Sequence, residues 1–288
     1  MKIAIASGKG GTGKTTLAVN LYHIIAKHFN PRVLLVDCDV EEPNDLLFYP
    51  QAILQADKAV NLSVPQIDTE KCTFCRKCSE YCEFNAITII PPLHHAEIAA
   101  DLCHACGACL YACKFDAISE APYEIGRIKH YNLESGLGLI EGRLKVGSAM
   151  QTPVIRALKK EASPPGSITI YDAPPGTSCS VVSTLADADF VVLVSEPTPF
   201  GLNDLKLALT LVRDLGKDFG LVINKAGMGN DELETFLTEE QIPILGKIPF
   251  DKAIARHYSG NAMLADVVPG YADHIIKIAS KILKQARP

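Results

Sequence analysis

The sequence predicts an α/β fold with a doubly wound, mostly parallel sheet, into which a smaller α+β unit is inserted. Two observations lead to this prediction. Short runs rich in Ile and Val alternate with stretches compatible with helices, and such continuous apolar strands are typical of a parallel sheet buried on both faces. The alternation stops between residues 60 and 119, where an internal repeat rich in cysteine takes its place.

The expected elements follow one another along both halves of the chain. The expected strands are Lys2–Ala6, Arg32–Val36, Ser167–Tyr171, Phe190–Val194, Gly220–Ile223 and Ile242–Ile248. The expected helices are Lys14–His28, Leu202–Leu215, Asp231–Glu240 and Tyr271–Gln285. We therefore expect residues 1–59 and 151–288 to form one discontinuous domain. Residues 60–119 would form the inserted domain, and residues 120–150 would return to the core as short strands and turns.

The composition describes a globular protein with a small negative charge. The chain has 28 Lys and Arg against 33 Asp and Glu, and this net charge of −5 argues against a nucleic-acid partner, which needs a basic surface. No apolar run approaches the ~20 residues of a membrane span, and no signal-peptide pattern is found, so we expect a cytoplasmic protein. Eight of the ten cysteines fall within residues 72–113, and in a reducing cytosol such clustering indicates metal binding rather than disulfides.

A glycine-rich loop, SGKGGTGKTT at residues 7–16, follows the first expected strand and opens the first expected helix. It satisfies the P-loop pattern G-x-x-x-x-G-K-T from Gly8 to Thr15, in which backbone N–H groups face phosphate oxygens at a helix N-terminus. Lys14 should reach the β- and γ-phosphates, and the Thr15 hydroxyl should coordinate Mg²⁺. The alternative is a glycine-rich turn with an incidental lysine. The residues expected to contact ATP or ADP here are Gly8, Lys9, Gly10, Gly11, Thr12, Gly13, Lys14, Thr15 and Thr16.

A second lysine, Lys9, lies inside this loop. The segment KGGTGKT resembles the deviant Walker A motif of the MinD/ParA superfamily, which also includes the nitrogenase iron protein and iron–sulfur scaffold ATPases. The resemblance implies that Lys9 crosses a dimer interface and contacts the partner's nucleotide, and hence that the protein forms a nucleotide-dependent homodimer. A lysine that is merely solvated in the loop is the alternative.

The resemblance extends to the acids that follow two strands. VLLVDCD places Asp37 and Asp39 at the carboxyl end of the second strand, where open α/β sheets bind ligands. The resemblance implies that Asp39 orients or activates the attacking water and that Asp37 lies near the metal. YDAPPG makes Asp172 the Walker B carboxylate, which shares Mg²⁺ with Asp37 and Thr15, and makes Pro174–Gly176 a switch that senses the γ-phosphate.

Two further segments complete the expected nucleotide site. By the same resemblance, VINKAG places Asn224 and Lys225 where adenine is bound, and IPFD places Pro249 in the loop that closes this pocket. The expected catalytic residues are Lys14, Asp39 and Lys9.

The cysteine repeat has a period of 31 residues. CTFCRKCSEYCEFNAI begins at Cys72 and CHACGACLYACKFDAI begins at Cys103. Each copy has the C-x₂-C-x₂-C-x₃-C run of bacterial ferredoxins, whereas zinc sites usually show two separated C-x₂-C pairs. The sequence thus predicts an inserted ferredoxin-like domain with two [4Fe–4S] clusters. Glu83 and Lys114 stand where ferredoxins usually have proline.

The resemblance to two-cluster ferredoxins implies that each cluster takes its fourth ligand from the other repeat. One cluster would be bound by Cys72, Cys75, Cys78 and Cys113. The other would be bound by Cys103, Cys106, Cys109 and Cys82. Cys179 lies outside the repeat, seven residues beyond Asp172, and we interpret it as a structural or redox-sensing thiol rather than as the ligand of a cluster shared by two subunits.

The C-terminal stretch Tyr271–Arg287 has isoleucines on one face and lysines nearby. A helix that covers the sheet has this pattern, and so does the membrane-binding C-terminal helix of MinD. We expect the first arrangement and therefore no membrane partner.

Together these features predict an ATPase whose nucleotide cycle is coupled to electron transfer through two [4Fe–4S] clusters. One alternative is an iron–sulfur cluster carrier or assembly ATPase. Another is a ParA/MinD-like positioning switch whose clusters sense redox state. The partner would be an unidentified redox or regulatory protein, and the roles of Cys179 and of residues 120–150 are not assigned by the sequence.

Overall fold

The computed structural model describes residues 1–29, 32–162, 164–229 and 231–285. Arg287, which ends the C-terminal stretch considered above, lies outside the described residues. The chain divides into two compact units. Unit 1 comprises Met1–Asp57, Ile128–Arg143 and Ile155–Pro288. Unit 2 comprises Lys58–Arg127 and Leu144–Val154.

The helices and strands have the following bounds. The strands are β1 (Lys2–Ala6), β2 (Val33–Asp37), β3 (Ile53–Ile67), β4 (Ile87–Ile90), β5 (His95–Ile98), β6 (Ile118–Asn132), β7 (Leu139–Leu144), β8 (Ile168–Asp172), β9 (Phe190–Ser195), β10 (Phe219–Ala226) and β11 (Ile244–Pro249). The α-helices are α1 (Lys14–His28), α2 (Lys77–Glu80), α3 (Ala108–Ala112), α4 (Gln151–Glu161), α5 (Cys179–Leu185), α6 (Pro199–Asp214), α7 (Glu232–Glu239), α8 (Lys252–Tyr258), α9 (Leu264–Val267) and α10 (Tyr271–Gln285). Three short 3₁₀ turns are η1 (Asp45–Phe48), η2 (Pro91–Leu93) and η3 (Ala100–Leu102).

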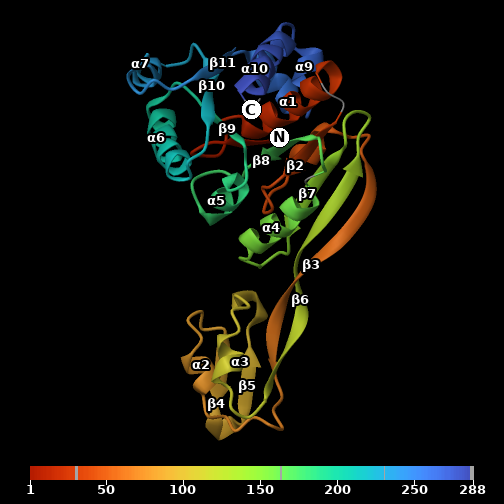
Figure 1. Ribbon diagram of the computed structural model, residues 1–288, viewed down its shortest axis with the longest axis vertical. Helices are drawn as coiled ribbons and strands as arrows, with labels where there is room; N and C mark the ends of the chain where they lie inside the picture. Colours follow the sequence, from red (N-terminus) through yellow and green to blue (C-terminus); the bar gives the residue numbers. More distant parts are fainter. Residues whose placement is uncertain (30–31, 163, 230, 286–288) are drawn as a thin grey trace. The chain divides into compact units, whose positions relative to one another are not determined.

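The main sheet has the strand order β11-β10-β9-β1-β8-β2-β7-β6-β3. Neighbours from β11 to β7 pair in parallel, which confirms the expected mostly parallel sheet. The central strands β2, β8 and β9 are buried along their whole length and mainly apolar, because helices cover both faces, and β2 and β8 each end in a buried aspartate. The chain moves from β1 past β8 to β2 through α1, but in the opposite direction from β8 through α5 to β9. Right-handed crossovers therefore put α1 and α5 on opposite faces (Figure 1).

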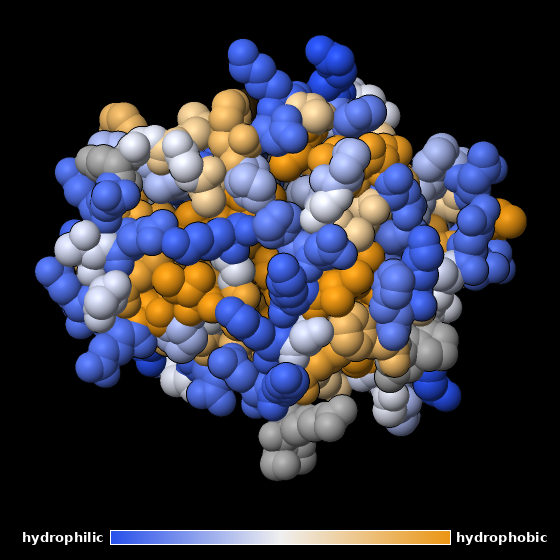
Figure 2. Space-filling view, turned by 90° about the horizontal axis from the view of Figure 1, so that it is seen from above, coloured by the Kyte–Doolittle hydropathy of each residue, from blue (hydrophilic) through white to orange (hydrophobic). Residues whose placement is uncertain are grey.

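The last helix, α10, is part of the core of unit 1. It packs on α1 and on β11, and its face formed by Ile275, Ile278 and Ile282 is fully buried. Hydrophilic side chains are spread between apolar areas over the end of the molecule that Figure 2 shows. The apolar face of α10 is thus explained by the sheet that it covers. In the parts of the chain that the structure describes, no helix combines the length and the apolar character needed to cross a bilayer.

The segment 120–150 differs from the short strands that the sequence suggested. β6 is 15 residues long, and β3, also 15 residues, precedes the cysteine repeat. Both strands pass from one unit into the other, at Asp57/Lys58 in β3 and at Arg127/Ile128 in β6. Side chains along β3 are mostly exposed, so this strand lacks the continuous apolar run by which the buried strands were identified.

Unit 2 has two small apolar cores built around the cysteines. One contains Cys78 and Cys109 together with Ile87 and Ile89 of the antiparallel pair β4–β5. The other contains Cys103 with Val64 and Ala86. The internal repeat also appears in the backbone. Residues with positive φ recur 31 positions apart: Phe74 and Ala105, Arg76 and Gly107, Asn85 and Asp116.

The burial of α10 leads to a prediction about stability. Ile275→Ala removes a fully buried side chain between α10 and the sheet, so the free energy of unfolding should fall by about 2–5 kcal/mol. Urea denaturation followed by circular dichroism measures this change. The matched variant Lys277→Ala lies on the exposed face of the same helix and should change stability by less than about 0.5 kcal/mol. Equal effects of the two variants would contradict the packing of α10 described above.

Candidate functional site

The glycine-rich loop joins β1 to α1, and its conformation depends on glycine. Gly11 and Gly13 have φ values of 75° and 94°, in the left-handed region that side chains rarely adopt. A Cβ atom at Gly13 would lie 2.3 Å from Nδ2 of Asn224. A Cβ atom at Gly8 would lie 2.1 Å from the backbone oxygen of Asp204. The loop therefore packs closely against α6 and β10, and only glycine fits at positions 8 and 13.

Lys14 and Thr15 begin helix α1 within this loop. Lys14 is buried, and its Nζ donates a hydrogen bond to the backbone oxygen of Lys9, at 3.5 Å. Burial lowers the pKa of Lys14, and the carboxylates of Asp172 and Asp39 oppose this shift. The hydroxyl of Thr15 donates to Oδ2 of Asp172, at 2.5 Å. The lysine and the hydroxyl thus lie beside acids that come from two other strands.

Those acids meet because of the register of the sheet. Asp37, at the end of β2, is the direct partner of Asp172, at the end of β8. Both side chains are buried. Burial raises the pKa of Asp172 to about 6, although Lys14 and Thr15 act to lower it. Asp39 is half-buried two residues after β2, and burial also raises its pKa.

The backbone after β2 holds Asp37 in place. Oδ1 of Asp37 accepts from the N–H of Asp39, at 3.0 Å. Its Oδ2 accepts from the N–H groups of Asn44 and Asp45, at 2.8 and 3.0 Å. The carboxylate therefore has a fixed orientation, as a metal ligand or a phosphate-facing group requires.

A cavity of about 290 Å³ lies beside the glycine-rich loop. Asn224, Lys225 and Pro249, which the sequence analysis assigned to adenine binding, all line it. Nδ2 of Asn224 donates to the backbone oxygen of Thr12, at 2.7 Å, and so connects the cavity to the loop. The volume is close to the lower end of the range for small-molecule sites. The other lining residues are Gly11, Gly13, Thr16, Leu17, Val194, Ile248, Phe250, Asp251, Ile254, Ala255, Tyr258 and Tyr271.

Lys9 does not point freely into solvent. Its Nζ lies 2.8 Å from Oε1 of Glu196, and Nζ of Lys225 lies 2.8 Å from Oε2 of the same carboxylate. The two lysines lower the pKa of Glu196. Glu196 was not predicted as a site residue. It follows β9 in the run SEPTP, where neither spacing nor motif distinguishes it from an exposed acid.

The expected switch segment follows β8 and leads into α5. The N–H of Gly176 donates to the backbone oxygen of Ser7, at 3.1 Å, so this segment contacts the beginning of the glycine-rich loop. Cys179 is exposed at the first residue of α5.

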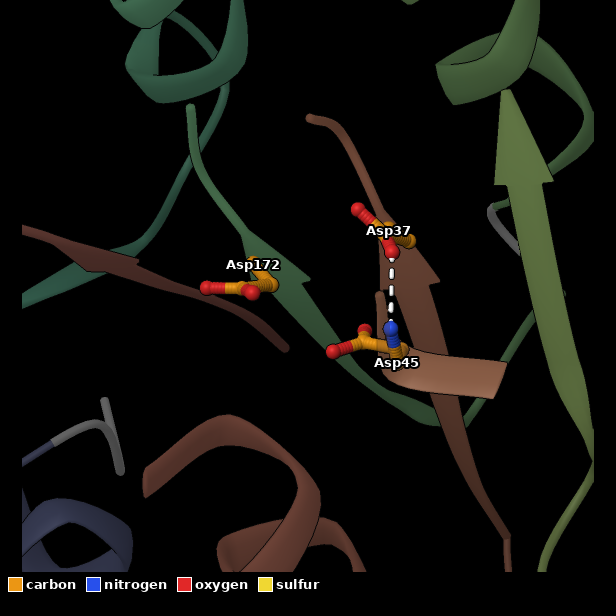
Figure 3. Close-up of side chains that lie close together, drawn as sticks. All are labelled: Asp37, Asp45 and Asp172. Carbon is orange, nitrogen blue, oxygen red and sulfur yellow. Dashed lines mark hydrogen bonds between the residues drawn. The ribbon is translucent and has the colours of Figure 1, made fainter. Parts of the chain in front are cut away.

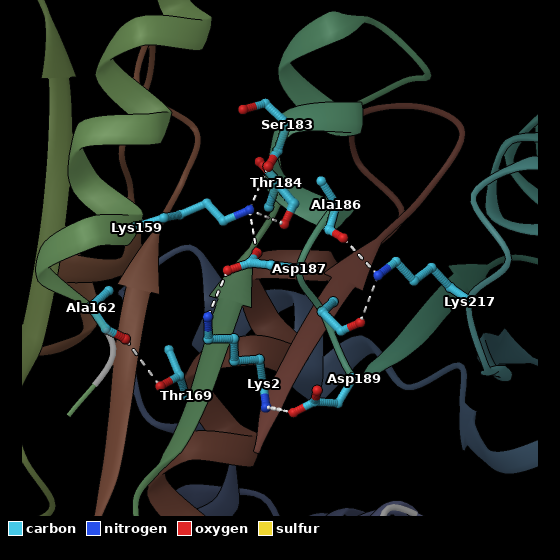
Figure 4. Close-up of polar contacts among 11 residues, drawn as sticks. Lys2, Lys159, Ala162, Thr169, Ser183, Thr184, Ala186, Asp187, Asp189 and Lys217 are labelled. Carbon is cyan, nitrogen blue, oxygen red and sulfur yellow. Dashed lines mark hydrogen bonds and ion pairs between the residues drawn. The ribbon is translucent and has the colours of Figure 1, made fainter. Parts of the chain in front are cut away.

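The far end of α5 is fastened to α4 and β1. The side chain of Lys159, from α4, contacts the backbone oxygens of Ser183 and Thr184 and the carboxylate of Asp187 (Figure 4). Lys2 of β1 binds the other oxygen of Asp187, at 2.7 Å. A displacement of α5 would therefore act on α4, the helix whose first turn belongs to unit 2.

Two cavities within unit 2 are lined by cysteines from both repeats. Cys72, Cys75 and Cys78 surround the first cavity together with Cys113. Cys103, Cys106 and Cys109 surround the second together with Cys82. The structure thus brings the cysteines together in the two groups that the resemblance to ferredoxins implied.

The lining of these cavities is otherwise largely apolar, and backbone N–H groups point at sulfur atoms. The N–H of Phe74 donates to Sγ of Cys72, and the N–H of Ala105 donates to Sγ of Cys103, both at 3.4 Å. These contacts are 31 residues apart, like the repeat itself. The ring of Phe84 stacks on His104 beside the second cavity, with 3.6 Å between the centroids.

The glycine-rich loop generates a prediction. Gly13→Ala introduces a Cβ atom at positive φ and against Asn224, so it should abolish detectable ATP binding and destabilise the protein by about 1–3 kcal/mol. Gly260→Ala, outside the loop, is the matched control and should bind MgATP as the wild type does, because its added carbon would lie 3.6 Å from the backbone oxygen of His257, an ordinary contact, at a φ that is not positive. Calorimetric titration with MgATP compares the two variants. ATP binding by Gly13→Ala at wild-type affinity would exclude the loop conformation described here.

The amino-acid sequence matches the CobQ/CobB/MinD/ParA nucleotide binding domain over residues 3–264. It is 32% identical over 283 residues to the uncharacterized protein MJ0578 of Methanocaldococcus jannaschii, with 98% of this chain and 96% of that protein covered. It is 24% identical over 289 residues to the uncharacterized ATP-binding protein MJ0547 of the same organism, with 98% and 87% covered.

The fold is similar to that of the septum site-determining protein MinD from Pyrococcus horikoshii, solved with Mg-ADP. The TM-score is 0.60 at 18% sequence identity, and 99% of this chain and 96% of that one are covered. At this identity the likeness concerns the fold alone. The match over residues 3–264, together with the geometry of the loop and its acids, shows that the chain belongs to the CobQ/CobB/MinD/ParA family of nucleotide-binding domains.

Proposed function

We propose that this protein is an Mg²⁺-dependent ATPase that acts as a nucleotide-controlled switch and dimerises when ATP is bound. The observation that carries the proposal is the convergence of Lys14, Thr15, Asp39 and Asp172 at one end of the sheet, beside a cavity of about 290 Å³. A lysine, a hydroxyl and carboxylates next to a glycine-rich loop are the groups that phosphoryl transfer needs.

Each side chain has a distinct role in this proposal. The N–H groups of the loop and Nζ of Lys14 bind and orient the phosphates, with the positive end of α1 behind them. Thr15, Asp172 and Asp37 are suited to hold Mg²⁺, which would neutralise charge on the phosphates. Asp39, half-buried and within the electrostatic reach of Lys14, accepts a hydrogen bond from the attacking water and orients it. Hydrolysis then releases the switch segment at Gly176.

Lys9 is the residue that would act on the partner's nucleotide. In the single chain its ammonium group is bound by Glu196, which also binds Lys225 of the cavity. An anionic phosphate in a dimer competes with Glu196 for Lys9. Glu196 therefore favours the monomer until ATP fills the site on the partner chain, and dimerisation becomes dependent on nucleotide.

The dimer proposal predicts the behaviour of two variants. Lys9→Ala should retain ATP binding but lose ATP-dependent dimerisation and lower kcat roughly 100-fold, because a charged donor to the phosphates is missing. Glu196→Gln should dimerise at a lower ATP concentration than the wild type, because it releases Lys9. Light scattering after size exclusion and a phosphate-release assay measure these effects. Lys277→Ala, an exposed lysine on α10, is the control. Wild-type dimerisation and turnover in Lys9→Ala would exclude the role given to Lys9.

A second function is favoured by the two groups of four cysteines in unit 2. We propose that each group binds a [4Fe–4S] cluster, the first with Cys113 and the second with Cys82 as the ligand from the other repeat. Four thiols around each cavity, a mainly apolar lining and N–H groups directed at Sγ atoms support this fit. When bound, such clusters supply one-electron redox chemistry, so the switch would control electron transfer or respond to redox state.

The chain offers a route by which the nucleotide site and unit 2 affect one another. The switch segment leads into α5, and Lys159 ties α5 to α4, whose residues Gln151–Val154 belong to unit 2. This route through α5 and α4 is the same whether the clusters carry electrons or only report on redox conditions.

Iron analysis tests both the clusters and the crossed arrangement of their ligands. The double variant Cys72→Ala/Cys113→Ala removes two ligands of the same cluster, so the anaerobically purified protein should keep about half of the wild-type iron and sulfide. If each repeat supplied all four ligands of one cluster, this variant would lose nearly all of both. Cys179→Ala is the control and should keep the wild-type content. Wild-type protein without acid-labile sulfide would exclude the clusters altogether while leaving the ATPase proposal intact.

A further inference from the structure

Asp45 is a buried acid for which the proposed ATPase cycle has no use. It begins the 3₁₀ turn η1, and none of its surface is exposed. Its backbone N–H donates to Asp37, but among the residues that the structure describes neither oxygen of its carboxylate has a hydrogen-bond partner. Burying an ionised carboxylate without a partner costs several kcal/mol. A ligand that accepts coordination by these oxygens would remove this cost.

The Asp45 side chain points toward two other buried acids. In Figure 3 its carboxylate extends from η1 toward Asp172 of β8, while Asp37 of β2 lies above it. One oxygen from each of Asp37, Asp45 and Asp172 can be chosen so that all three lie within 4.8 Å of one another. The Oδ1 atom of Asp172 is also without a partner among the described residues. One carboxylate oxygen from each of three elements thus lies in the same small volume.

The charges around Asp45 are mainly negative. The charged groups that act on Asp45 are the carboxylates of Asp37, Asp172, Glu141 and Asp39. The positive charge of Lys14 attracts the carboxylates of both Asp172 and Asp39. A bound cation would offset the repulsion among these three buried acids.

We propose that Asp37, Asp45 and Asp172 hold a hard divalent cation, of the Mg²⁺, Mn²⁺ or Ca²⁺ class, in the absence of nucleotide. Carboxylate oxygens are the ligands that such ions prefer. Oxygens on opposite sides of Ca²⁺ lie about 4.8 Å apart, so three oxygens within 4.8 Å of one another can share this ion. Mg²⁺ requires the three oxygens to come within about 4.2 Å of one another.

This inference goes beyond the proposed function, with which it shares Asp37 and Asp172. Mg²⁺ in nucleotide sites is commonly held by one or two carboxylates together with substrate phosphates, so the ion arrives with the nucleotide. Asp45 adds a third carboxylate and makes a site from the protein alone. The metal would then occupy the empty protein, compensate the repulsion between β2 and β8, and be present when the nucleotide binds.

Manganese binding to the nucleotide-free holoprotein tests the inference. Free Mn²⁺ is counted by its EPR signal during titration, and we expect about one tight site per chain, from which Mg²⁺ or Ca²⁺ displaces Mn²⁺. Cysteine sulfur does not compete for this hard ion. Asp45→Asn keeps the shape of the side chain and should weaken Mn²⁺ binding at least tenfold. Glu41→Gln, an exposed acid in the same loop, is the matched control and should bind as the wild type does.

The outcomes separate this inference from the ATPase proposal. Wild-type protein that binds Mn²⁺ only after nucleotide is added overturns the inference alone, and this result needs no variant to fold. Tight binding by Asp45→Asn without nucleotide also overturns it. Tight nucleotide-free binding that depends on Asp45, in a protein that neither binds nor hydrolyses ATP, supports the cation site and excludes the ATPase.

Discussion

The pairing of β2 with β8 is the constraint on which the nucleotide site depends. Because the two parallel strands end in register, Asp37 and Asp172 are brought side by side although 135 positions separate them in the sequence. Two buried carboxylates at this distance repel each other. The chain surrounds them with Lys14, Thr15 and the N–H groups after β2, all of which favour negative charge. The strand pairing and these neighbouring groups in unit 1 thus keep the two acids close together despite their repulsion.

The parallel sheet and its helices could be predicted because their signals are local. α1 and α10 begin and end at the expected residues, and the buried strands deviate from the expected bounds by only a few positions. The glycine-rich loop was identifiable for the same reason, since a phosphate-binding turn needs glycines at fixed spacing. The long strands β3 and β6 were not predicted, because exposed side chains along β3 remove the apolar signal.

The parts of the site that the sequence did not indicate depend on contacts between distant segments. Asp45 resembles any polar residue after a strand, and only the fold shows that it is buried beside two other acids. Glu196 could be identified only from its contacts with Lys9 of the glycine-rich loop and Lys225 of β10, which are distant from it in the sequence. The cysteine sites could be predicted only in part from the sequence. Their spacing predicted a metal site, but the division into two groups required an analogy, and in the structure it follows from how the two repeats face each other.

The position of β8 affects the order in which the two units can fold while the chain is being synthesised. This strand lies between β1 and β2, yet it is synthesised after both of them and after all eight cysteines of unit 2. The growing chain therefore carries the whole of the cysteine repeat before the centre of the sheet can close, and closing it requires contacts between segments far apart in the sequence, which form slowly. Unit 2 thus has time to fold on a chain in which Asp172 has not yet joined Asp37 at the end of the sheet.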